Sequence, residues 1–539
     1  MQKFLKNVKV FLVHTRRYND MLHKLGSAVN IDIDLFWYIY KSCGDDLSEV
    51  EKQLSMYLDE YRDKGISDLL FCIFTQCSIV PTETMTWFAD NLNRREEDGV
   101  SVDYTREDRL LPCKLAYENF DGDPMEFLLN KTRDMGMRAW ISVRMNDCHG
   151  AHQRTNWIRG DIYYEARKNG WMIGDEAVAP YYGECFDYSH PGIRDRMYRY
   201  IAEMLDRYDT DGLELDYMRE LFCFDYKNNP DCADIMTEFL TRVRAYVRKK
   251  ELERGHSIRL AVRVCRDAEH NKIFGIDVAR WIREGLVDVV IPTSRWCSTD
   301  TEIPVKEWKR LTDGTKVEIW PGIEFFIKLP AVNSHETVRA MTAQYSDLGA
   351  DKIYIYNYYR ECAQRDGDMA SEYGLDTLHF LDYDSNYREI DARNVAIWRT
   401  ASDPCAAHTG VRRYIVTGVE PLLIPEGVSQ IQPLPTDATD GVTLTKTTGD
   451  VTGCRLILYL GIESGTEAPE VTFDGKRAEL LGDSTDAYFT FCEICGGDRA
   501  ALGNNVYYAY SVTAGDGFER RITVRGNCTV NALEIKATK

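Results

Sequence analysis

YDTDGLELDYMRE, from Tyr208 to Glu220, is the stretch of sequence that decides the fold. Side chains alternate between the two faces of a strand, so Leu213 and Leu215 share one face. Glu214 and Asp216 share the other. A strand with one ionised face is costly to bury, and the mouth of a parallel barrel is where that cost is accepted, because side chains there meet substrate. We therefore predict a catalytic strand, with a surface strand whose acids pair with nearby arginines as the alternative.

The length and charge of the chain limit what it can be. At 539 residues it exceeds what one hydrophobic core supports, which predicts a barrel of roughly 250 to 400 residues and a smaller second domain. The formal net charge of -20 repels phosphate backbones, so nucleic acid is not an expected partner. The sequence has no membrane-length apolar run, and the apolar run near the N-terminus is too short for a signal peptide. We expect a cytoplasmic protein that contacts no membrane.

The 16 cysteines are scattered singly through strand and helix patterns, which indicates a reducing environment and no disulfide framework. Cys492 and Cys495 form a CxxC within FCEICGG, without a second pair at zinc-finger spacing. We interpret them as two buried thiols, with a metal or redox site as the alternative.

Between about residues 30 and 360, short runs rich in Ile, Val, Phe and Tyr alternate with longer amphipathic stretches. This alternation is typical of repeated βα units, and eight strands predict an α/β fold, a (β/α)8 TIM barrel within residues 1–395. The predicted strands are Asn30–Tyr40, Asp68–Thr75, Arg138–Asp147, Asp211–Met218, Ile258–Cys265, Val287–Thr293, Val317–Phe325 and Lys352–Tyr359. Val8–Thr15 competes for the first position, and we prefer Asn30–Tyr40 because it runs straight into the first clear helix.

After about residue 400 the helical periodicity disappears. Short strands such as VRRYIVTG, CRLILYLGIE and RITVRG follow at hairpin spacing, with Gly, Asp and Asn between them. This pattern predicts an all-β sandwich, jelly-roll-like, over residues 400–539. We expect this domain to brace the barrel, with carbohydrate binding as the alternative.

Two predicted loops, residues 76–120 and 148–190, are too long to be mere connections, and each follows the carboxyl end of a strand. Loops at that end build the active-site rim of barrel enzymes. The second loop is dense in aromatic residues: Trp157, Trp171, Tyr181, Tyr182 and Phe186. These rings either hold a sugar through its apolar face or staple the loop to the barrel.

The same alternation of faces places polar side chains from several strands in the barrel lumen. In the third strand, for example, Ile141 and Val143 face the helices, which leaves Ser142 facing inward. The charged and amide residues expected in the lumen are Arg144, Asn146, Glu214, Asp216, Arg263 and Glu324.

Cleavage of a glycosidic bond needs a pair of carboxylates, because one group moves a proton while the other attacks or stabilises the oxocarbenium-like carbon. We predict that Asp216 and Glu324 are this pair, since they lie near the carboxyl ends of the fourth and seventh strands. Glu269 is a reserve acid. The sequence leaves open which group is the acid and whether the reaction retains or inverts configuration. A purely structural network of buried charges is the alternative.

The other predicted site residues bind substrate or support it. We expect Glu214 to orient Arg144 or Arg263, and Asp147 and His149 to bind sugar hydroxyls. The substrate-binding set is Arg144, Asn146, Asp147, His149, Glu214, Arg219, Arg263, Trp296 and Trp320. The arginines near the rim (Arg144, Arg219, Arg263, Arg295 and Arg360) suit an anionic sugar such as a uronic acid, although we expect most of them to offset the chain's acids.

The run RMNDCHGAH, residues 144–152, offers a second interpretation. Asn146, Asp147, His149 and His152 carry oxygen and imidazole ligands that suit several divalent ions. Their spacing is diagnostic of no particular metal, so we predict neither a metal nor a cofactor.

The segments SVRMND (Ser142 to Asp147), YDTDGLELDYMRE, IRLAVRV and GIEF, in that order, resemble bacterial proteins with a glycoside-hydrolase-like (β/α)8 barrel and a C-terminal β domain, largely of unassigned activity. The resemblance covers most of residues 40–360 and weakly the tail. Its DGxELDxxR pattern matches at Asp211, Gly212, Glu214, Leu215, Asp216 and Arg219. The chain lacks the Asn-Glu pair that marks strand four of the largest retaining glycosidase clan, so that clan's roles are not carried over. The strand-four Asp is similar to the nucleophile of other families.

The leading functional hypothesis is therefore a glycoside hydrolase acting on a small or terminal saccharide. The alternatives are a catalytically silent sugar-binding barrel and a metal-dependent hydrolase or lyase. The sequence leaves the sugar, the linkage and the oligomeric state open, a homo-oligomer included.

Overall fold

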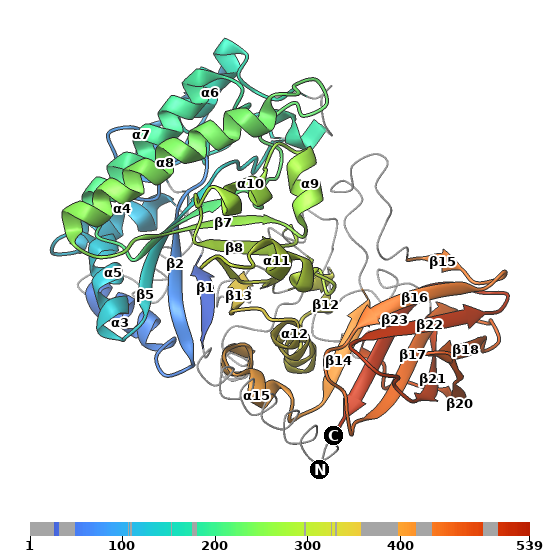
Figure 1. Ribbon diagram of the computed structural model, residues 1–539. Helices are drawn as coiled ribbons and strands as arrows, with labels where there is room; N and C mark the ends of the chain where they lie inside the picture. The colour runs from blue at the N-terminus through green and yellow to red at the C-terminus, as the bar shows by residue number, and fades with distance from the viewer. Residues whose placement is uncertain are drawn as a thin grey trace.

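The computed structural model describes residues 26–31, 49–105, 107, 110–151, 153–174, 180–295, 298–324, 326–328, 331–356, 397–416, 434–488 and 505–539 (Figure 1). The strand candidate Val8–Thr15, the CxxC at Cys492 and Cys495, and the predicted site residue Trp296 lie outside these residues.

The first part of the chain forms one curled parallel sheet. Its strands are β1 (Ser27–Ile31), β2 (Ile66–Phe74), β5 (Arg138–Arg144), β6 (Gly212–Asp216), β7 (Arg259–Cys265), β8 (Val289–Thr293), β9 (Glu318–Ile319), β10 (Gly322–Glu324) and β13 (Ile353–Tyr356). They lie in the order β10-β13-β1-β2-β5-β6-β7-β8-β9, and every neighbouring pair is parallel.

The two end strands, β9 and β10, are successive pieces of one chain segment, separated by Trp320 and Pro321. Trp320 N donates to Val290 O on one side, at 2.9 Å, and Tyr354 N donates to Pro321 O on the other, at 3.1 Å. The edges of the sheet therefore meet in this segment, which agrees with the predicted barrel.

The first strand begins three residues earlier than the sequence pattern placed it. β1 spans Ser27–Ile31 and pairs with both β13 and β2, so it contains the first two residues of the predicted Asn30–Tyr40; residues 32–48 lie outside those the structure describes. The run SAVNI is buried throughout, and its small residues Ser27 and Ala28 weaken the apolar signal on which the prediction rested.

Helices surround the curled sheet in Figure 1. They are α3 (Val50–Asp59), α4 (Leu110–Asn119), α5 (Pro124–Asp134), α6 (Asp161–Asn169), α7 (Pro191–Arg207), α8 (Cys232–Arg254), α9 (Ala268–Ile273), α10 (Val278–Arg283), α11 (Val305–Leu311) and α12 (His335–Asp347). Local sequence sets their ends: Pro191 begins α7, and α8 ends where Gly255 adopts a left-handed φ of 75°. Among the helices described, none is both long and apolar enough to cross a membrane.

Two separate cores pack on the two faces of the sheet. Apolar residues such as Leu213, Leu215 and Val262 belong to the large core shared with the helices. Trp140 and Trp320 belong to a smaller cluster with alternate strand residues such as Ala261, Val289 and Tyr354, which fills the lumen. Gly212 is required beside Trp140, because a Cβ there would lie 2.1 Å from the indole.

Charged residues close the lumen at the amino ends of the strands. Asp68 accepts hydrogen bonds from Arg138 at 2.6 and 2.8 Å, from Lys352 at 2.5 Å and from Trp140 Nε1 at 2.9 Å. Burial alone would raise the pKa of Asp68, but the charges of Lys352 and Arg138 outweigh it and hold the pKa at about 2. Above this layer the rings of Trp140 and Trp320 meet edge to face, with centroids 5.7 Å apart.

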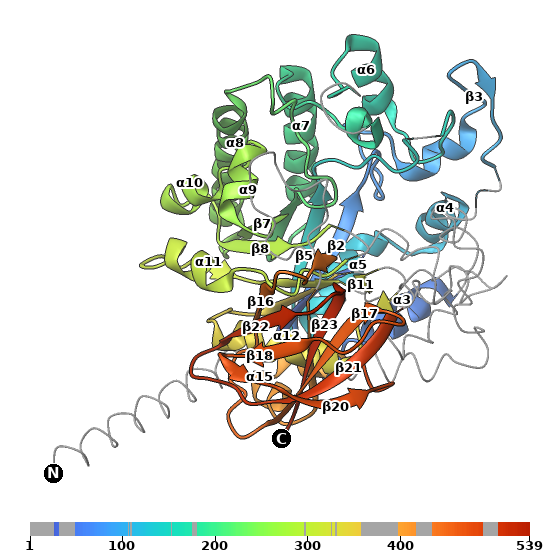
Figure 2. The same ribbon diagram turned by 90° about the vertical axis from the view of Figure 1, so that its right-hand side faces the viewer.

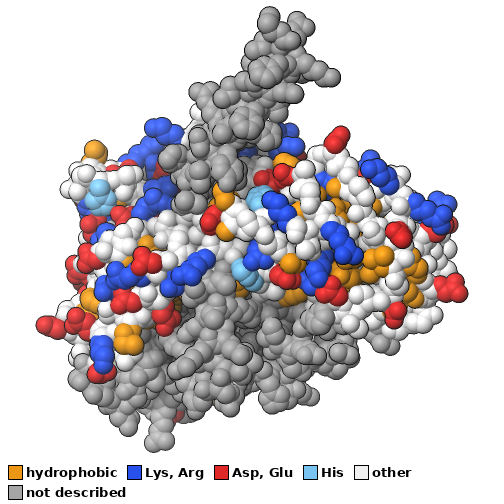
Figure 3. Space-filling model, turned by 90° about the horizontal axis from the view of Figure 1, so that it is seen from below, with side chains coloured by type: hydrophobic (Ala, Val, Ile, Leu, Met, Phe, Trp, Pro, Cys, Tyr) orange, Lys and Arg blue, Asp and Glu red, His pale blue; other side chains and the backbone are white. Residues whose placement is uncertain are grey.

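The last part of the chain is an all-β unit of two antiparallel sheets, as predicted in class. Its strands are β14 (Arg412–Val416), β15 (Thr436–Asp437), β16 (Val442–Thr447), β17 (Arg455–Glu463), β18 (Glu470–Phe473), β19 (Lys476–Arg477), β20 (Glu479–Asp483), β21 (Asn505–Val512), β22 (Glu519–Arg525) and β23 (Thr529–Thr538). One sheet runs β14-β23-β17-β21-β20 and the other β16-β22-β18-β19, with a shared hydrophobic core. Figures 1 and 2 show the unit beside α12, which contacts β14. Seen from below, the described surface carries intermixed acidic and basic side chains (Figure 3).

Candidate active site

Asp216 is the last residue of β6 and lies buried at the carboxyl end of the strand. Its Oδ1 accepts hydrogen bonds from the backbone N–H groups of Met218 and Arg219, at 2.8 and 2.9 Å. Arg263 Nη1 donates to both carboxylate oxygens, at 3.0 and 2.9 Å. The carboxylate therefore shapes the turn that follows its own strand and is bound to a charged donor from the next strand.

Arg263 extends from β7 across the lumen to β13. Its guanidinium carbon lies 3.8 Å from the ring centroid of Tyr356 in β13. Tyr356 is in turn the backbone partner of Glu324 in β10. Burial alone would lower the pKa of Arg263, but Asp216 outweighs it and raises that pKa, so the guanidinium stays charged.

Asp147, just beyond β5, is the centre of a second group of charges. It accepts hydrogen bonds from Arg144 at 3.0 Å and from His149 Nδ1 at 2.5 Å, and Arg219 Nε lies 3.9 Å away. Burial alone would raise the pKa of Asp147, but His149, Arg144 and Arg219 together hold it far below its usual range. Arg219 also contacts His149 Nε2, so the ring that binds Asp147 through one nitrogen meets a guanidinium through the other.

Glu214 lies in the lumen one alternate position before Asp216, fully buried. Its Oε2 accepts a hydrogen bond from Asn30 of β1, at 3.0 Å. Burial and the nearby charge of Asp216 raise the pKa of Glu214 to about 7, against smaller opposing effects of Ser142 and Arg263. The expected partners Arg144 and Arg263 bind Asp147 and Asp216 instead. Glu214 is thus a fully buried carboxyl group whose pKa is raised toward neutral pH.

Glu324 is the last residue of β10 and is buried. Its backbone is held on both sides: Glu324 N donates to Thr299 Oγ1 at 3.2 Å, and its carbonyl accepts from Asn333 Nδ2 at 2.7 Å. Asp216 and Glu324 therefore both end strands of the same curled sheet, at its carboxyl edge.

Three predicted site residues lie apart from this group. The side-chain amide of Asn146 bonds to the backbone: it donates to the carbonyls of Phe186 and Phe222 and accepts from Phe186 N. Trp320 lies toward the amino ends of the strands, where its Nε1 donates to Glu318 at 2.8 Å. Glu269 is exposed on the first turn of α9. His152 and Arg360 are outside the described residues.

The aromatic residues of the second long loop mostly pack against protein. Trp157 meets Phe88 edge to face at 5.5 Å, and Trp171 stacks on His190 at 6.3 Å. Tyr182 and Phe186 are buried. Tyr181 differs because it is only partly buried and lies 5.3 Å from the Arg295 guanidinium.

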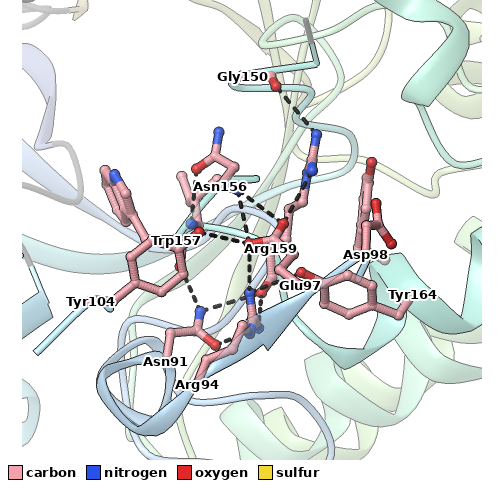
Figure 4. A network of polar contacts seen from close by, with 12 residues as sticks. Asn91, Arg94, Glu97, Asp98, Tyr104, Gly150, Asn156, Trp157, Arg159 and Tyr164 are labelled. Atoms are coloured by element: carbon pink, nitrogen blue, oxygen red, sulfur yellow. Dashed lines mark hydrogen bonds and ion pairs between the residues drawn. The ribbon is translucent and has the colours of Figure 1, made fainter. Parts of the chain in front are cut away.

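A network around Glu97 ties the two long loops together (Figure 4). Glu97 lies in β3 (Glu96–Glu97) and accepts from Asn156 N at 2.9 Å, Arg159 at 3.1 Å and Tyr104 at 2.7 Å. Asn156 Nδ2 then donates to the carbonyl of His149, at 3.0 Å. Glu97 of the first loop thereby supports, through Asn156, the backbone of His149 near the start of the second loop.

Sequence reasoning did not identify Tyr356 and Asn30 as parts of this region. Both lie in segments predicted as strands. In the eighth predicted strand, the alternation of faces puts Lys352, Tyr354 and Tyr356 on one side, and this is the signal that identifies Tyr356 as a lumen residue. Among the described residues, no three of His, Cys, Asp and Glu gather as metal ligands.

Comparison with protein-family models and with curated proteins finds no match. Among solved structures, a cycloisomaltooligosaccharide glucanotransferase of Paenibacillus sp. is 11% identical with a TM-score of 0.34, covering 96% of this chain and 57% of that chain. Alpha-L-fucosidase isoenzyme 2 from Paenibacillus thiaminolyticus is 12% identical with a TM-score of 0.38, covering 70% and 48%. The maltogenic alpha-amylase AmyB from Thermotoga neapolitana is 10% identical with a TM-score of 0.34, covering 95% and 98%. The chain thus spans about half the length of the first two, and likenesses this distant identify neither activity nor substrate.

Proposed function

We propose that the protein is a glycoside hydrolase that cleaves a glycosidic bond of a small or terminal saccharide with two carboxylates. One observation carries the proposal: Asp216 and Glu324 end two strands at the same edge of the curled sheet, and Arg263 links them by binding Asp216 and lying on the ring of Tyr356, the neighbour of Glu324. Acids at the carboxyl ends of barrel strands are the usual catalytic groups of such folds.

The contacts suggest how the roles divide. Asp216 accepts hydrogen bonds from two backbone N–H groups and one guanidinium, which hold its carboxylate at the carboxyl end of β6. We assign it the part of nucleophile or stabiliser of the developing oxocarbenium ion, and Glu324 the part of the acid and base.

In this proposal, the charged groups around Asp147 bind the substrate. His149 is about one-third exposed, whereas Asp147 is buried beneath it. We assign His149 and Arg219 to sugar hydroxyls at the mouth, with Asp147 holding both in place. A uronic acid would add a carboxylate for the guanidiniums, and turnover of uronate-bearing against neutral glycosides distinguishes the two substrate classes.

Glu324→Gln and Asp216→Asn test the assignment on a panel of chromogenic glycosides. We expect each to reduce kcat by about a thousandfold or more, which is typical for loss of a catalytic carboxylate, with an unchanged circular dichroism spectrum. Glu238→Gln, an exposed acid on α8, is the control and should retain full activity. Full activity in Glu324→Gln and Asp216→Asn would refute the proposal.

Two other outcomes would point to the alternatives. Sugar binding without turnover in the unmodified protein would support a silent binding barrel. Loss of turnover after dialysis against a chelator would support a metal-dependent enzyme, whereas the two-carboxylate mechanism predicts no loss.

A further inference from the structure

The loop after β8 contains a short segment, Thr299–Glu302, whose first three residues are buried and which contacts three parts of the molecule. Thr299 and Thr301 are nearly inaccessible to solvent, at 1% and 2% exposure, and Asp300 between them is also buried. Polar residues buried in succession are retained only when their groups are hydrogen-bonded, so their partners show what the segment connects.

Thr299 connects the segment to the candidate acid Glu324. Its hydroxyl accepts from Glu324 N at 3.2 Å and donates to Glu324 O at 3.1 Å. Asn333 Nδ2 donates to the same hydroxyl at 2.8 Å and to Glu324 O at 2.7 Å. Thr299 N also donates to Ile327 O, at 3.2 Å. The backbone on both sides of the acid is therefore fixed by one threonine and one asparagine.

Asp300 connects the segment to the strand that carries Arg263. Asp300 Oδ2 accepts from Arg266 Nε at 2.5 Å, and Arg266 also donates to the carbonyl of Glu302 at 2.6 Å. Arg266 directly follows β7. Tyr345 of α12 donates to Asp300 O at 2.7 Å, which closes the segment against a helix.

Thr301 and Glu302 connect the segment to the C-terminal all-β unit. Thr301 Oγ1 donates to Ile415 O of β14, at 2.6 Å. Lys446 of β16 donates to Thr301 O at 2.8 Å and pairs with Glu302. Lys446 has a side-chain exposure of only 1%, so this ammonium is buried at the junction and depends on these partners.

We propose that the C-terminal all-β unit positions Glu324 through this segment, so that the barrel mouth is complete only with the unit docked. Thr301 and Lys446 are positioning residues, which act through the backbone of Thr299 and Glu324 and not by touching substrate. The structural part stands on the contacts themselves, and its catalytic consequence rests on the proposed function.

Hydrogen exchange of the full-length chain tests the structural part. Thr301→Val removes the hydroxyl while keeping the shape of the side chain, and Thr301→Ser keeps the hydroxyl. We expect Thr301→Val to speed exchange over Gly322–Lys328 by about tenfold, the effect of losing one buried hydrogen bond, and Thr301→Ser to remain near the unmodified protein. Lys446→Met should act on the same amides in the same direction.

Thr443→Val is the matched control, because it removes an exposed hydroxyl from the same strand as Lys446, where Thr443 bonds to Thr523 at 2.9 Å. It should leave exchange over Gly322–Lys328 unchanged. Equal exchange in Thr301→Val and Thr301→Ser, with the all-β unit still protected, would overturn the proposal.

Kinetics test the catalytic consequence. Thr301→Val should lower kcat about tenfold at a KM within twofold, because a displaced acid affects the transition state more than the bound ground state. Thr301→Ser should keep the kcat of the unmodified protein. If Thr301 acted on stability alone, kcat per folded molecule would be the same in Thr301→Val and Thr301→Ser. A protein without hydrolase activity would refute the proposed function and could still show the exchange difference, whereas an active protein with equal exchange would refute only this inference.

Discussion

A single nitrogen of Arg263, Nη1, donates to both carboxylate oxygens of Asp216, inside the barrel and with both side chains at most 2% exposed. Arg263→Met would leave a buried carboxylate without its cation, and such a loss costs about 3–5 kcal/mol of unfolding free energy. Urea denaturation measures it. Arg310→Met, which removes an exposed partner of Glu307 in α11, should change the unfolding free energy little. Equal effects would show that the buried pair is not a strong constraint.

The pH dependence of stability should show the proton held by Glu214. The folded pKa of about 7 exceeds the ordinary value of 4.5, so between these values the folded chain binds more protons than the unfolded chain. The unfolding free energy contributed by Glu214 therefore falls as pH rises through this window, by roughly 3 kcal/mol. Glu214→Gln should lack this fall, so its stability relative to the unmodified protein should improve from pH 4.5 to 8. Parallel pH curves would contradict the assignment.

Asp68 should behave in the opposite way. Its pKa is lowered to about 2 from 3.8, so its contribution is present above pH 4 and is lost as pH falls through 2. We expect Asp68→Asn to lose about 2 kcal/mol at pH 7, and its deficit to shrink on acidification. Asp59→Asn, which removes an exposed partner of Arg62, is the control and should change the unfolding free energy little. Denaturant titrations between pH 2 and 7 measure both.

Glu97→Gln should loosen both long loops at once. A neutral amide cannot match the carboxylate that accepts from Asn156 N, Arg159 and Tyr104, so we expect faster limited proteolysis within residues 95–105 and 149–160. The neighbouring Asp98 pairs with Arg167 at the surface, and Asp98→Asn should be cleaved at the rate of the unmodified protein. Faster cleavage of only one loop would show that Glu97 does not couple them.

The alternation of side chains within strands predicts most of the residues that face the lumen, because a strand buried on both faces has only two directions for its side chains. Arg144, Arg263 and Asp216 were expected in the lumen, and the structure joins Arg263 to Asp216 there. The rule fails beyond the strand ends, where the chain no longer alternates. Asn146 was assigned to the lumen by the rule, yet it follows β5 and braces two loops.

The position of the first strand and the partners of the acids could not be read from local pattern. β1 is identified by its parallel pairing with β13, which is more than 300 residues away in the chain, and not by its own apolar content. Likewise, Glu214 binds Asn30 and not an arginine, because Asp147 and Asp216 take the guanidiniums. Which carboxylate a buried arginine binds depends on distances in space, and these cannot be derived from the spacing of residues in the sequence.

The paired indoles of Trp140 and Trp320, with the ion pairs of Asp68 beneath them, fill the lumen at the amino ends of the strands. For the proposed glycoside hydrolase, this leaves the carboxyl ends of the strands as the side by which substrate reaches Asp216 and product departs. Product and incoming substrate then share one passage, and a leaving fragment that lingers there blocks the next arrival. Under the proposed function, inhibition by product should accordingly be competitive.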